Sequence, residues 1–267
     1  MNLRNVRRIS FKNCQIDAER AANISLVSSE TQQFFCHLDV SGNPLKDQGV
    51  NALLSAACRN ENCQLRVFQF ASCQLEVQGA IRISHLLQGK HRNALGSQIQ
   101  ILNLASNNIA NVGMEALCQY LEPNKSLLYL DVSHNAIEDR GMLAAARLVQ
   151  QNTTLQALIM TGNSFTGRPL PKLTVALTTN VQSRLFILHI GELKCTAAEF
   201  EEFIRTGAQF AISLRYLYLT TPHADEPCVS LVNKSSSYVS ISAAQSLTQR
   251  ASSGRVLEEY IYLAEYG

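Results

Sequence analysis

Histidine and cysteine are the side chains of this sequence best suited to binding a metal or to catalysis, and their spacing decides whether they could do so. The chain has no HExxH motif, no pair of histidines four residues apart and no Cys-x-x-Cys pair. The phosphate-binding patterns GxxxxGK[ST] and GxGxxG and the GxSxG nucleophile elbow are also missing. The sequence therefore predicts no catalytic residue, no metal site and no cofactor. The histidines are expected to be ordinary surface side chains: His37, His85, His91, His134, His189 and His223.

The cysteines indicate a reducing compartment. The N-terminus carries Arg4, Arg7 and Arg8 but no apolar stretch behind them, so a secretory signal is not expected. These arginines would also suit a transit peptide, although they fit equally well in the first repeat described below. Without a secretion signal, thiols are favoured over disulfides. The cysteines are Cys14, Cys36, Cys58, Cys63, Cys73, Cys118, Cys195 and Cys228.

The charge balance argues against two classes of partner. Lysine and arginine together number 23 and aspartate and glutamate 21, which gives a formal net charge of +2. Proteins that bind nucleic acid usually show a clear basic excess. No run of about 18 apolar residues is present either, so no membrane span is predicted. Direct contact with nucleic acid or with a membrane is therefore not expected.

The chain repeats itself. The template L-x-x-L-x-L-x-x-N/C-x-L fits the chain eight times, the last two times imperfectly. The copies begin 28 to 34 residues apart, which is too regular to arise by chance. They occupy residues 6–16, 35–45, 65–75, 99–109, 127–137, 155–165, 185–195 and 214–224.

The ninth template position has a structural interpretation. The chain turns out of a strand there, and an asparagine side chain can both donate and accept hydrogen bonds to the turn. Cys14 and Cys73 take this position in two copies and are interpreted as structural, since a thiol fits and donates weakly. The last two copies are degraded, with Leu193 and Pro222 there. Asparagine fills the position in the other four, as Asn43, Asn107, Asn135 and Asn163.

Amphipathic helices are predicted between the copies. In four units a glycine follows the template by four residues, and apolar residues then recur at helical spacing. Pro171 falls near one helix start, where its missing N–H is harmless. Three of the helices are expected to stop at an Asn-x-x-Leu step. The stripes include Val50/Leu53/Leu54/Ala57, Met114/Leu117/Cys118/Leu121, Met142/Ala145/Ala146/Val149 and Leu170/Leu173/Thr174/Leu177.

Over residues 3–224 the sequence resembles the ribonuclease-inhibitor class of leucine-rich repeats. The resemblance implies an α/β solenoid, a horseshoe of about eight repeats plus caps. Strands lie about 4.8 Å apart and helices about 8–10 Å apart, so the stack bends with the parallel β-sheet on its concave face and the α-helices on its convex face.

We predict two regions, a solenoid over residues 1–224 and a C-terminal loop and capping segment over 225–267. Residues 222–238 are polar and suggest a loop, 242–250 could form a last helix, and Leu257, Tyr260 and Tyr262 could form a last strand. Residues 88–97 lengthen one unit at its helix-to-strand edge. The C-terminal segment could instead dock onto a partner.

The concave face is the candidate binding surface, because the third and fifth template positions point out of the sheet. Its second half is apolar and aromatic, and such exposed stripes mark partner sites. Two alternatives stay open: Phe186, Tyr260, Tyr262 and Tyr266 could pack a C-terminal cap onto this face, or partners could bind the helices. The predicted partner-binding residues are Tyr129, Asp131, Ile159, Ile187, His189, Tyr216 and Tyr218.

The expected function is therefore a non-enzymatic protein–protein interaction module. It would be a scaffold or structural subunit of a eukaryotic, cytoplasmic assembly, with protein partners and no small-molecule substrate. The alternative is a regulator of a small GTPase, since the Ran GTPase-activating protein is similar in repeat type. Members of that family carry a strongly acidic tail, whereas this chain ends in LEEYIYLAEYG. Tropomodulin, axonemal repeat subunits and the sensing domains of NOD-like receptors are similar to the same degree.

Overall fold

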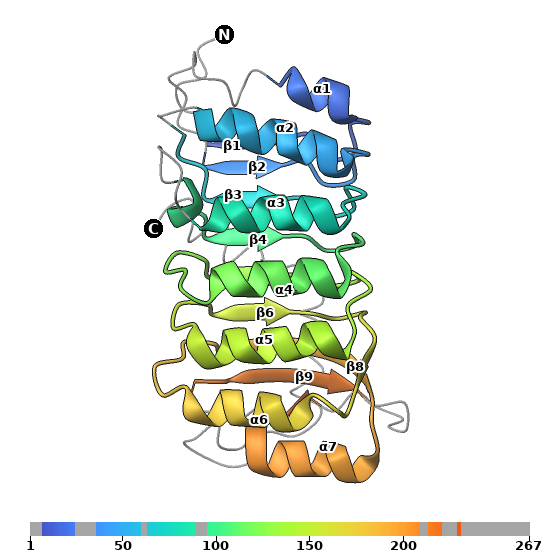
Figure 1. Ribbon diagram of the computed structural model, residues 1–267, viewed down its shortest axis with the longest axis vertical. Coiled ribbons are helices and arrows are strands. Elements are labelled where there is room, and N and C mark those ends of the chain that lie inside the picture. The colour runs from blue at the N-terminus through green and yellow to red at the C-terminus, as the bar shows by residue number, and fades with distance from the viewer. Residues whose placement is uncertain are drawn as a thin grey trace.

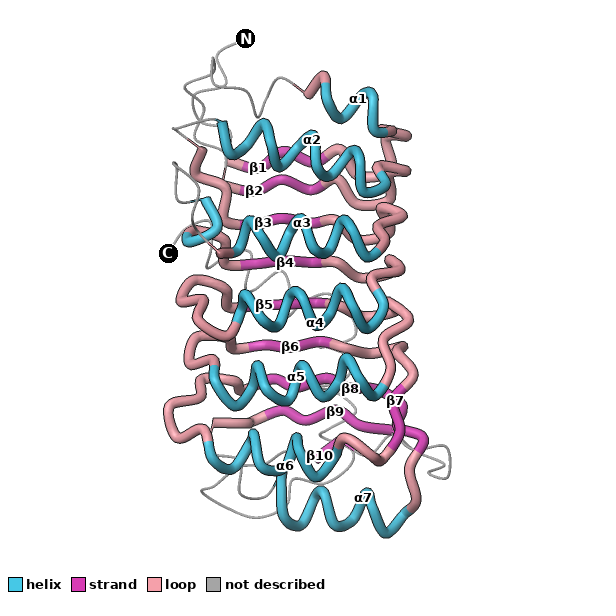
Figure 2. Tube along the Cα trace, in the orientation of Figure 1, coloured by secondary structure: helices cyan, strands magenta, loops and turns pink. Residues whose placement is uncertain are grey.

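The computed structural model describes residues 7–24, 36–59, 63–88, 95–208, 213–220 and 229–230. They form two layers, a row of helices packed on one face of a sheet (Figures 1 and 2). The elements, in chain order, are β1 Arg8–Ser10, α1 Ala18–Ala22, β2 His37–Asp39, α2 Lys46–Arg59, β3 Val67–Gln69, α3 Val77–Leu87, a 3-10 turn Leu95–Ser97, β4 Ile101–Asn103, α4 Ala110–Leu121, β5 Tyr129–Asp131, α5 Asp139–Gln151, β6 Ala157–Ile159, β7 Phe165–Thr166, α6 Leu170–Thr179, β8 Ile187–Lys194, α7 Ala197–Phe203, a π-turn Ile204–Ala208, β9 Tyr216–Thr220 and β10 Val229–Ser230.

The sheet confirms the repeat register. Strands β1 to β6, β8 and β9 follow one another in order and pair in parallel, with template positions aligned from strand to strand. A helix returns the chain between neighbouring strands, as parallel pairing requires. The row of helices extends past the sheet, α1 beyond β1 and α7 beyond β9 (Figure 1), so the sheet lies on the inside of the solenoid.

The core lies between the sheet and the helices. The fourth template position supplies its sheet side, with Phe68, Leu102 and Leu130 each at most 1% exposed. The predicted helical stripes supply the other side, and only Thr174 among their members is partly exposed. Pro171 lies in the first turn of α6, as expected. Each helix and strand buries its apolar side only against its neighbours, so a single repeat could not fold alone.

A ladder of asparagines, of which Asn43 and Asn135 are buried and Asn107 and Asn163 partly buried, joins the repeats at the edge where the strands end. The side-chain Nδ2 of Asn43 donates to the carbonyl oxygens of Val40 (2.7 Å) in its own repeat and Phe11 (2.8 Å) in the preceding one. Its Oδ1 accepts from the backbone N–H groups of Cys14 and Ile16, both at 2.9 Å. Asn107 and Asn163 make the same four contacts with their own neighbours.

A second ladder lies at the edge where the strands start. Asn152 donates to the carbonyl oxygens of Leu121 (2.7 Å) and Asn124 (3.0 Å) in the preceding repeat, while its Oδ1 accepts from Leu155 N–H (2.7 Å). Asn180 donates in the same way to Val149 and Asn152. The predicted Asn-x-x-Leu helix stop therefore satisfies the last carbonyl groups of the preceding helix.

Cysteine fills the ninth position less completely. The Sγ of Cys73 donates to the carbonyl oxygens of Val40 (3.3 Å) and Ala71 (3.5 Å). Burial raises the pKa of this thiol to about 12, so it stays protonated and unreactive. These contacts support the structural interpretation of Cys73. Cys14, in the outermost repeat, is exposed.

The degraded copies change the strands. With Leu193 in the ninth position no amide ends the strand, and β8 continues for eight residues to pair with β7. The register with β9 shifts between His189 and Gly191. Gly191 has a φ of +81°, and a Cβ there would lie 2.9 Å from Cγ2 of Thr161, so the shift requires glycine.

Some sequence expectations concern residues outside the described ranges. The predicted helix at 242–250 and the predicted strand near 257–262 lie entirely outside them. Within the polar stretch 222–238 the structure contains β10, which pairs antiparallel with β9, so this stretch is more than a loop. Of the extension at 88–97 the structure describes Gln88 and the 3-10 turn Leu95–Ser97, which lie between α3 and β4.

We predict that Asn43→Ala lowers the free energy of unfolding by about 3 kcal/mol or more, because it leaves buried backbone groups in two repeats unpaired at roughly 1–3 kcal/mol each. Asn43→Cys should cost less, since the thiol of Cys73 fits the same position. Urea unfolding measures both, with Asn51→Ala on the exposed face of α2 as the control. An Asn43→Ala chain as stable as this control would contradict the role of the ladder.

Candidate functional site

The concave face carries two rows of side chains that cross the strands. The third-position row lies nearer the strand starts and consists of Arg8, His37, Val67, Ile101, Tyr129, Ala157, Ile187 and Tyr216. The fifth-position row lies nearer the strand ends and consists of Ser10, Asp39, Gln69, Asn103, Asp131, Ile159, His189 and Tyr218. All seven predicted partner-binding residues lie in these rows.

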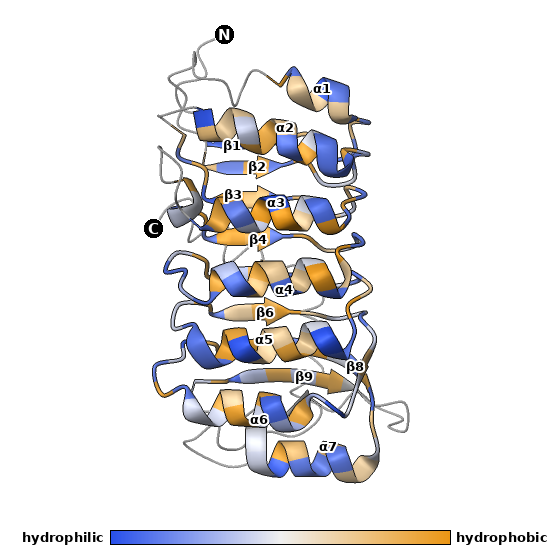
Figure 3. Cartoon of the chain, viewed as in Figure 1, coloured by the Kyte–Doolittle hydropathy of each residue, from blue (hydrophilic) through white to orange (hydrophobic). Residues whose placement is uncertain are grey.

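The third-position row is buried over most of its length. Tyr129 and Ile187 are 4% and 8% exposed, so the prediction that they belong to an exposed stripe was wrong. With Val67, Ile101 and Ala157, each 0% exposed, they form an apolar cluster separate from the main core. At the two ends of the row Arg8 is exposed and Tyr216 is 39% exposed. Figure 3 shows β3, β4 and β6 largely in apolar colours, whereas β2 is mixed.

The fifth-position row remains partly open. Asp131, Ile159 and Tyr218 are partly exposed, and with Tyr216 they form the accessible part of the predicted site. The acidic and amide members of this row also shape the turns behind them. Asp131 Oδ1 accepts from the N–H of Ser133 at 2.9 Å, and Asn103 accepts from Ala105 at the same distance. Their positions are therefore fixed by the backbone before any partner arrives.

Asp131 has an unusual environment for a carboxylate. Burial raises its pKa, and hydrogen bonds from Ser133 and Tyr129, together with the nearby His134, partly offset that rise. A desolvated carboxylate with a fixed orientation binds a donor or cation more strongly than one in open water. It is the only acidic residue in the C-terminal half of the two rows.

His189 is buried, contrary to the expectation of a surface histidine. Its ring is 7% exposed and meets the Tyr218 ring edge-on, with centroids 4.1 Å apart. Its Nε2 atom has no hydrogen-bond partner among the residues that the structure describes. Burial lowers the pKa of His189 to about 4, so the imidazole is neutral near pH 7. His37, on β2, is also buried at 2% exposed, and its Nε2 lies 2.9 Å from Nε2 of Gln69.

No cluster of three metal-ligating side chains occurs within the described residues. His37 and His189 lie on β2 and β8, with four strands between them, too far apart to share a metal. Burial raises the pKa of the thiols of Cys63 and Cys118, the former to about 11, which disfavours thiolate chemistry there. In the described part of the chain, no helix has the length and hydropathy needed to cross a membrane.

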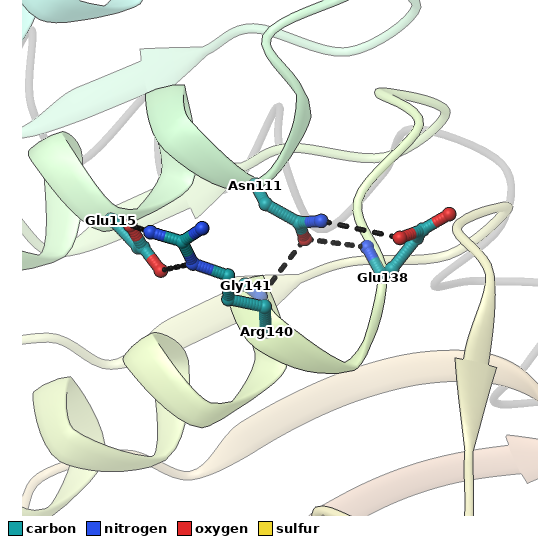
Figure 4. Close-up of polar contacts among 5 residues, drawn as sticks. All are labelled: Asn111, Glu115, Glu138, Arg140 and Gly141. Carbon is teal, nitrogen blue, oxygen red and sulfur yellow. Dashed lines mark hydrogen bonds and ion pairs between the residues drawn. The ribbon is translucent and has the colours of Figure 1, made fainter.

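The convex face offers a different surface. Its polar side chains pair with one another between repeats (Figure 4). Asn111 of α4 accepts from the N–H groups of Glu138 (2.9 Å) and Gly141 (3.0 Å) at the start of α5, and Arg140 makes a two-pronged ion pair with Glu115. Val112 on α4, Leu143 on α5 and Val175 on α6 are also exposed, one on each helix. Scattered apolar residues of this kind do not mark a binding site.

Known proteins share these repeats. A family model described as "Leucine Rich repeat" matches residues 34–54, 99–118 and 124–144. The chain is 32% identical over 176 residues to NACHT, LRR and PYD domains-containing protein 14 of Mus musculus, covering 54% of this chain and 17% of that protein. It is 28% identical over 213 residues to NACHT, LRR and PYD domains-containing protein 3 of Bos taurus, covering 71% of this chain and 20% of that protein. The chain thus spans about a fifth of the length of these relatives.

The buried His189 generates a pH-dependent prediction. In the unfolded chain the pKa of His189 is near its ordinary value of 6.5, whereas burial in the folded chain lowers it to about 4. The unfolded chain therefore binds a proton that the folded chain does not, and stability is lost as pH falls from 6.5 toward 4. Between pH 6.5 and 5 we expect the native chain to lose about 2 kcal/mol more unfolding free energy than His189→Gln.

Urea titrations of both chains at the two pH values measure this difference, and the carboxylates common to both chains, including Asp131, cancel. Equal losses in the two chains would show that His189 is not desolvated in solution.

Proposed function

We propose that this chain, which is a leucine-rich-repeat protein, is a module that binds another protein through the open part of its concave face. This binding surface consists of Asp131, Ile159, Tyr216 and Tyr218. The observation that carries the proposal is their arrangement: two partly open tyrosines on β9, an aliphatic side chain two strands away and one desolvated carboxylate beyond it. Tyrosine anchors and a few fixed polar groups are typical of binding hot spots.

Preorganisation favours this use. The asparagine ladders hold β5 and β6 in register, so Asp131 and Ile159 are placed without further ordering when a partner binds. Little conformational entropy is then lost on association. His189 contributes indirectly, because its ring packs edge-on against Tyr218 and limits the orientations of that side chain.

The surface also indicates what a partner should present. Tyr216, Tyr218 and Ile159 would bury apolar or aromatic side chains. Asp131 would accept a hydrogen bond from an arginine, a lysine or a backbone N–H. We therefore infer a protein segment with an apolar anchor flanked by a basic or donor group.

The wider role follows from the fold class. We propose a non-enzymatic scaffold or structural subunit within a cytoplasmic assembly, with repeats of the ribonuclease-inhibitor class. The strand and helix of each repeat, the unit length of about 28–30 residues and the likeness to proteins whose names include leucine-rich repeats support this. No group in the described concave rows suggests a substrate.

A paired substitution tests the binding surface. We expect Tyr216→Ala with Tyr218→Ala to lose a defined set of proteins in affinity capture and to weaken the binding of each purified member at least tenfold, because hot-spot truncations cost roughly 2 kcal/mol or more. The matched control is Val112→Ala with Val175→Ala, which removes exposed apolar side chains from the convex helices and should retain the same proteins.

Loss of the captured proteins from the Val112→Ala/Val175→Ala variant and not from the Tyr216→Ala/Tyr218→Ala variant would place the contact on the convex face.

The GTPase-regulator alternative is tested on the same preparation. GTP hydrolysis accelerated by catalytic amounts of the chain would replace the scaffold proposal with that activity.

A further inference from the structure

The proposed function does not use the pair of arginines next to β1. Arg7 and Arg8 are the only two consecutive arginines in the sequence, and Ser10 follows them with one residue between. All three lie within the described residues, with Ser10 as the last residue of β1. β1 is the first strand in the order of the sheet, at the end away from β9 with its Tyr216 and Tyr218 (Figure 2).

The hydroxyl of Ser10 is accessible and weakly held. Arg7, Arg8 and Ser10 are all exposed. The Oγ of Ser10 donates to Oδ2 of Asp39 and accepts from the backbone N–H of Lys12, both at 3.4 Å. Hydrogen bonds of this length are weak, so another molecule can replace them at little cost.

The backbone around Ser10 already has the conformation that an enzyme groove accepts. β1 is extended and pairs with β2 through three residues. Its apolar residue Ile9 is only partly buried against the core. A short terminal strand with few buried contacts opens locally at a small free-energy cost. An enzyme can therefore bind residues 7–10 without unfolding the solenoid.

A second serine shows how the structure separates similar sequences. Ser84 also follows an arginine by two residues, in this case Arg82. However, Ser84 lies inside α3 and is 0% exposed, and its Oγ donates to the carbonyl oxygen of Ile81 at 2.7 Å. The hydroxyl of Ser84 is thus withheld from other molecules, whereas that of Ser10 is not.

We propose that Ser10 is a phosphorylation site for a protein kinase whose substrate groove is acidic. Arg7 and Arg8 supply the positive charges that such a groove selects, three and two residues before the serine. In the transfer, Oγ of Ser10 attacks the γ-phosphorus of ATP and forms a new O–P bond. The bond from this phosphorus to the bridging oxygen breaks, ADP leaves, and the hydroxyl proton passes to the base of the kinase.

The phosphate changes the charge of one end of the concave face. Arg8 and Ser10 lie on the same side of β1, and Asp39 lies opposite Ser10 on β2. The formal charges of Arg8 and Asp39 cancel, and a phosphoserine adds about −2 near pH 7. This end of the face therefore turns from neutral to acidic. The inference does not rest on the partner proposed for Tyr216 and Tyr218.

Phosphorylation of the full chain in vitro tests the site. The probe is cyclic-AMP-dependent protein kinase, which selects arginines at these two positions, with magnesium and ATP. Peptide mass spectrometry measures Ser10 and Ser84 separately. We expect phosphate on Ser10 and about 100-fold less on Ser84, because Ser84 is reached only when α3 opens. The proposal is overturned by a chain that takes up no phosphate on Ser10, or by similar rates at the two serines, which would mean that the kinase acts on unfolded chains.

A pair of double variants tests the role of the arginines. Arg7→Gln with Arg8→Gln should slow phosphorylation of Ser10 about tenfold or more, because the complementary charges that bind the kinase are lost. The matched control is Lys46→Gln with Arg59→Gln, which removes two exposed positive charges from α2 and should leave the rate unchanged. Circular dichroism checks that each variant is folded. Equal rates in the two variants would contradict selection by Arg7 and Arg8.

Discussion

The hydrogen bonds of the ladder asparagines are the constraint on which the rest of this structure depends. Each amide joins two consecutive repeats, because it donates to carbonyl groups of both and accepts from N–H groups of one of them. The strands and helices would otherwise end in unpaired backbone groups inside the solenoid. One ladder at the strand ends and another at the strand starts hold the repeats that carry these asparagines in register with their neighbours.

Because the strands are in register, equivalent side chains of successive repeats form rows. Positions three and five align from β1 to β9. Side chains from neighbouring strands therefore lie next to one another and form surfaces that no single strand could form. From Val67 to Ile187 the third-position row becomes a continuous apolar band, and the fifth-position row becomes a partly open line of polar, aliphatic and aromatic groups. Where Leu193 replaces the asparagine, β8 lengthens and its register with β9 shifts, so the surface changes in the same place as the ladder.

Much of the fold could be predicted from the sequence, since the template positions and the helical stripes report directly on which side chains are buried in the core. The outcome at the site was different. Periodicity placed Tyr129, Ile187 and His189 on the concave face but could not show that they are buried, because it reports the side of the strand on which a residue lies and not how much of its side chain is exposed. The burial of His37 and the pairing of β10 with β9 also depend on contacts between residues far apart in the sequence. A local pattern of residues does not predict such contacts.

The central claim is that the concave face is divided into a buried part, Val67 to Ile187 of the third-position row, and an open surface formed by Asp131, Ile159, Tyr216 and Tyr218. Hydroxyl-radical footprinting of the intact chain, read by mass spectrometry at single tyrosines, tests this most directly. The account predicts rapid oxidation of Tyr216 and slow oxidation of Tyr129, although the two occupy the same template position on β9 and β5. Equal oxidation of the two tyrosines would contradict the division and return the whole concave face to solvent.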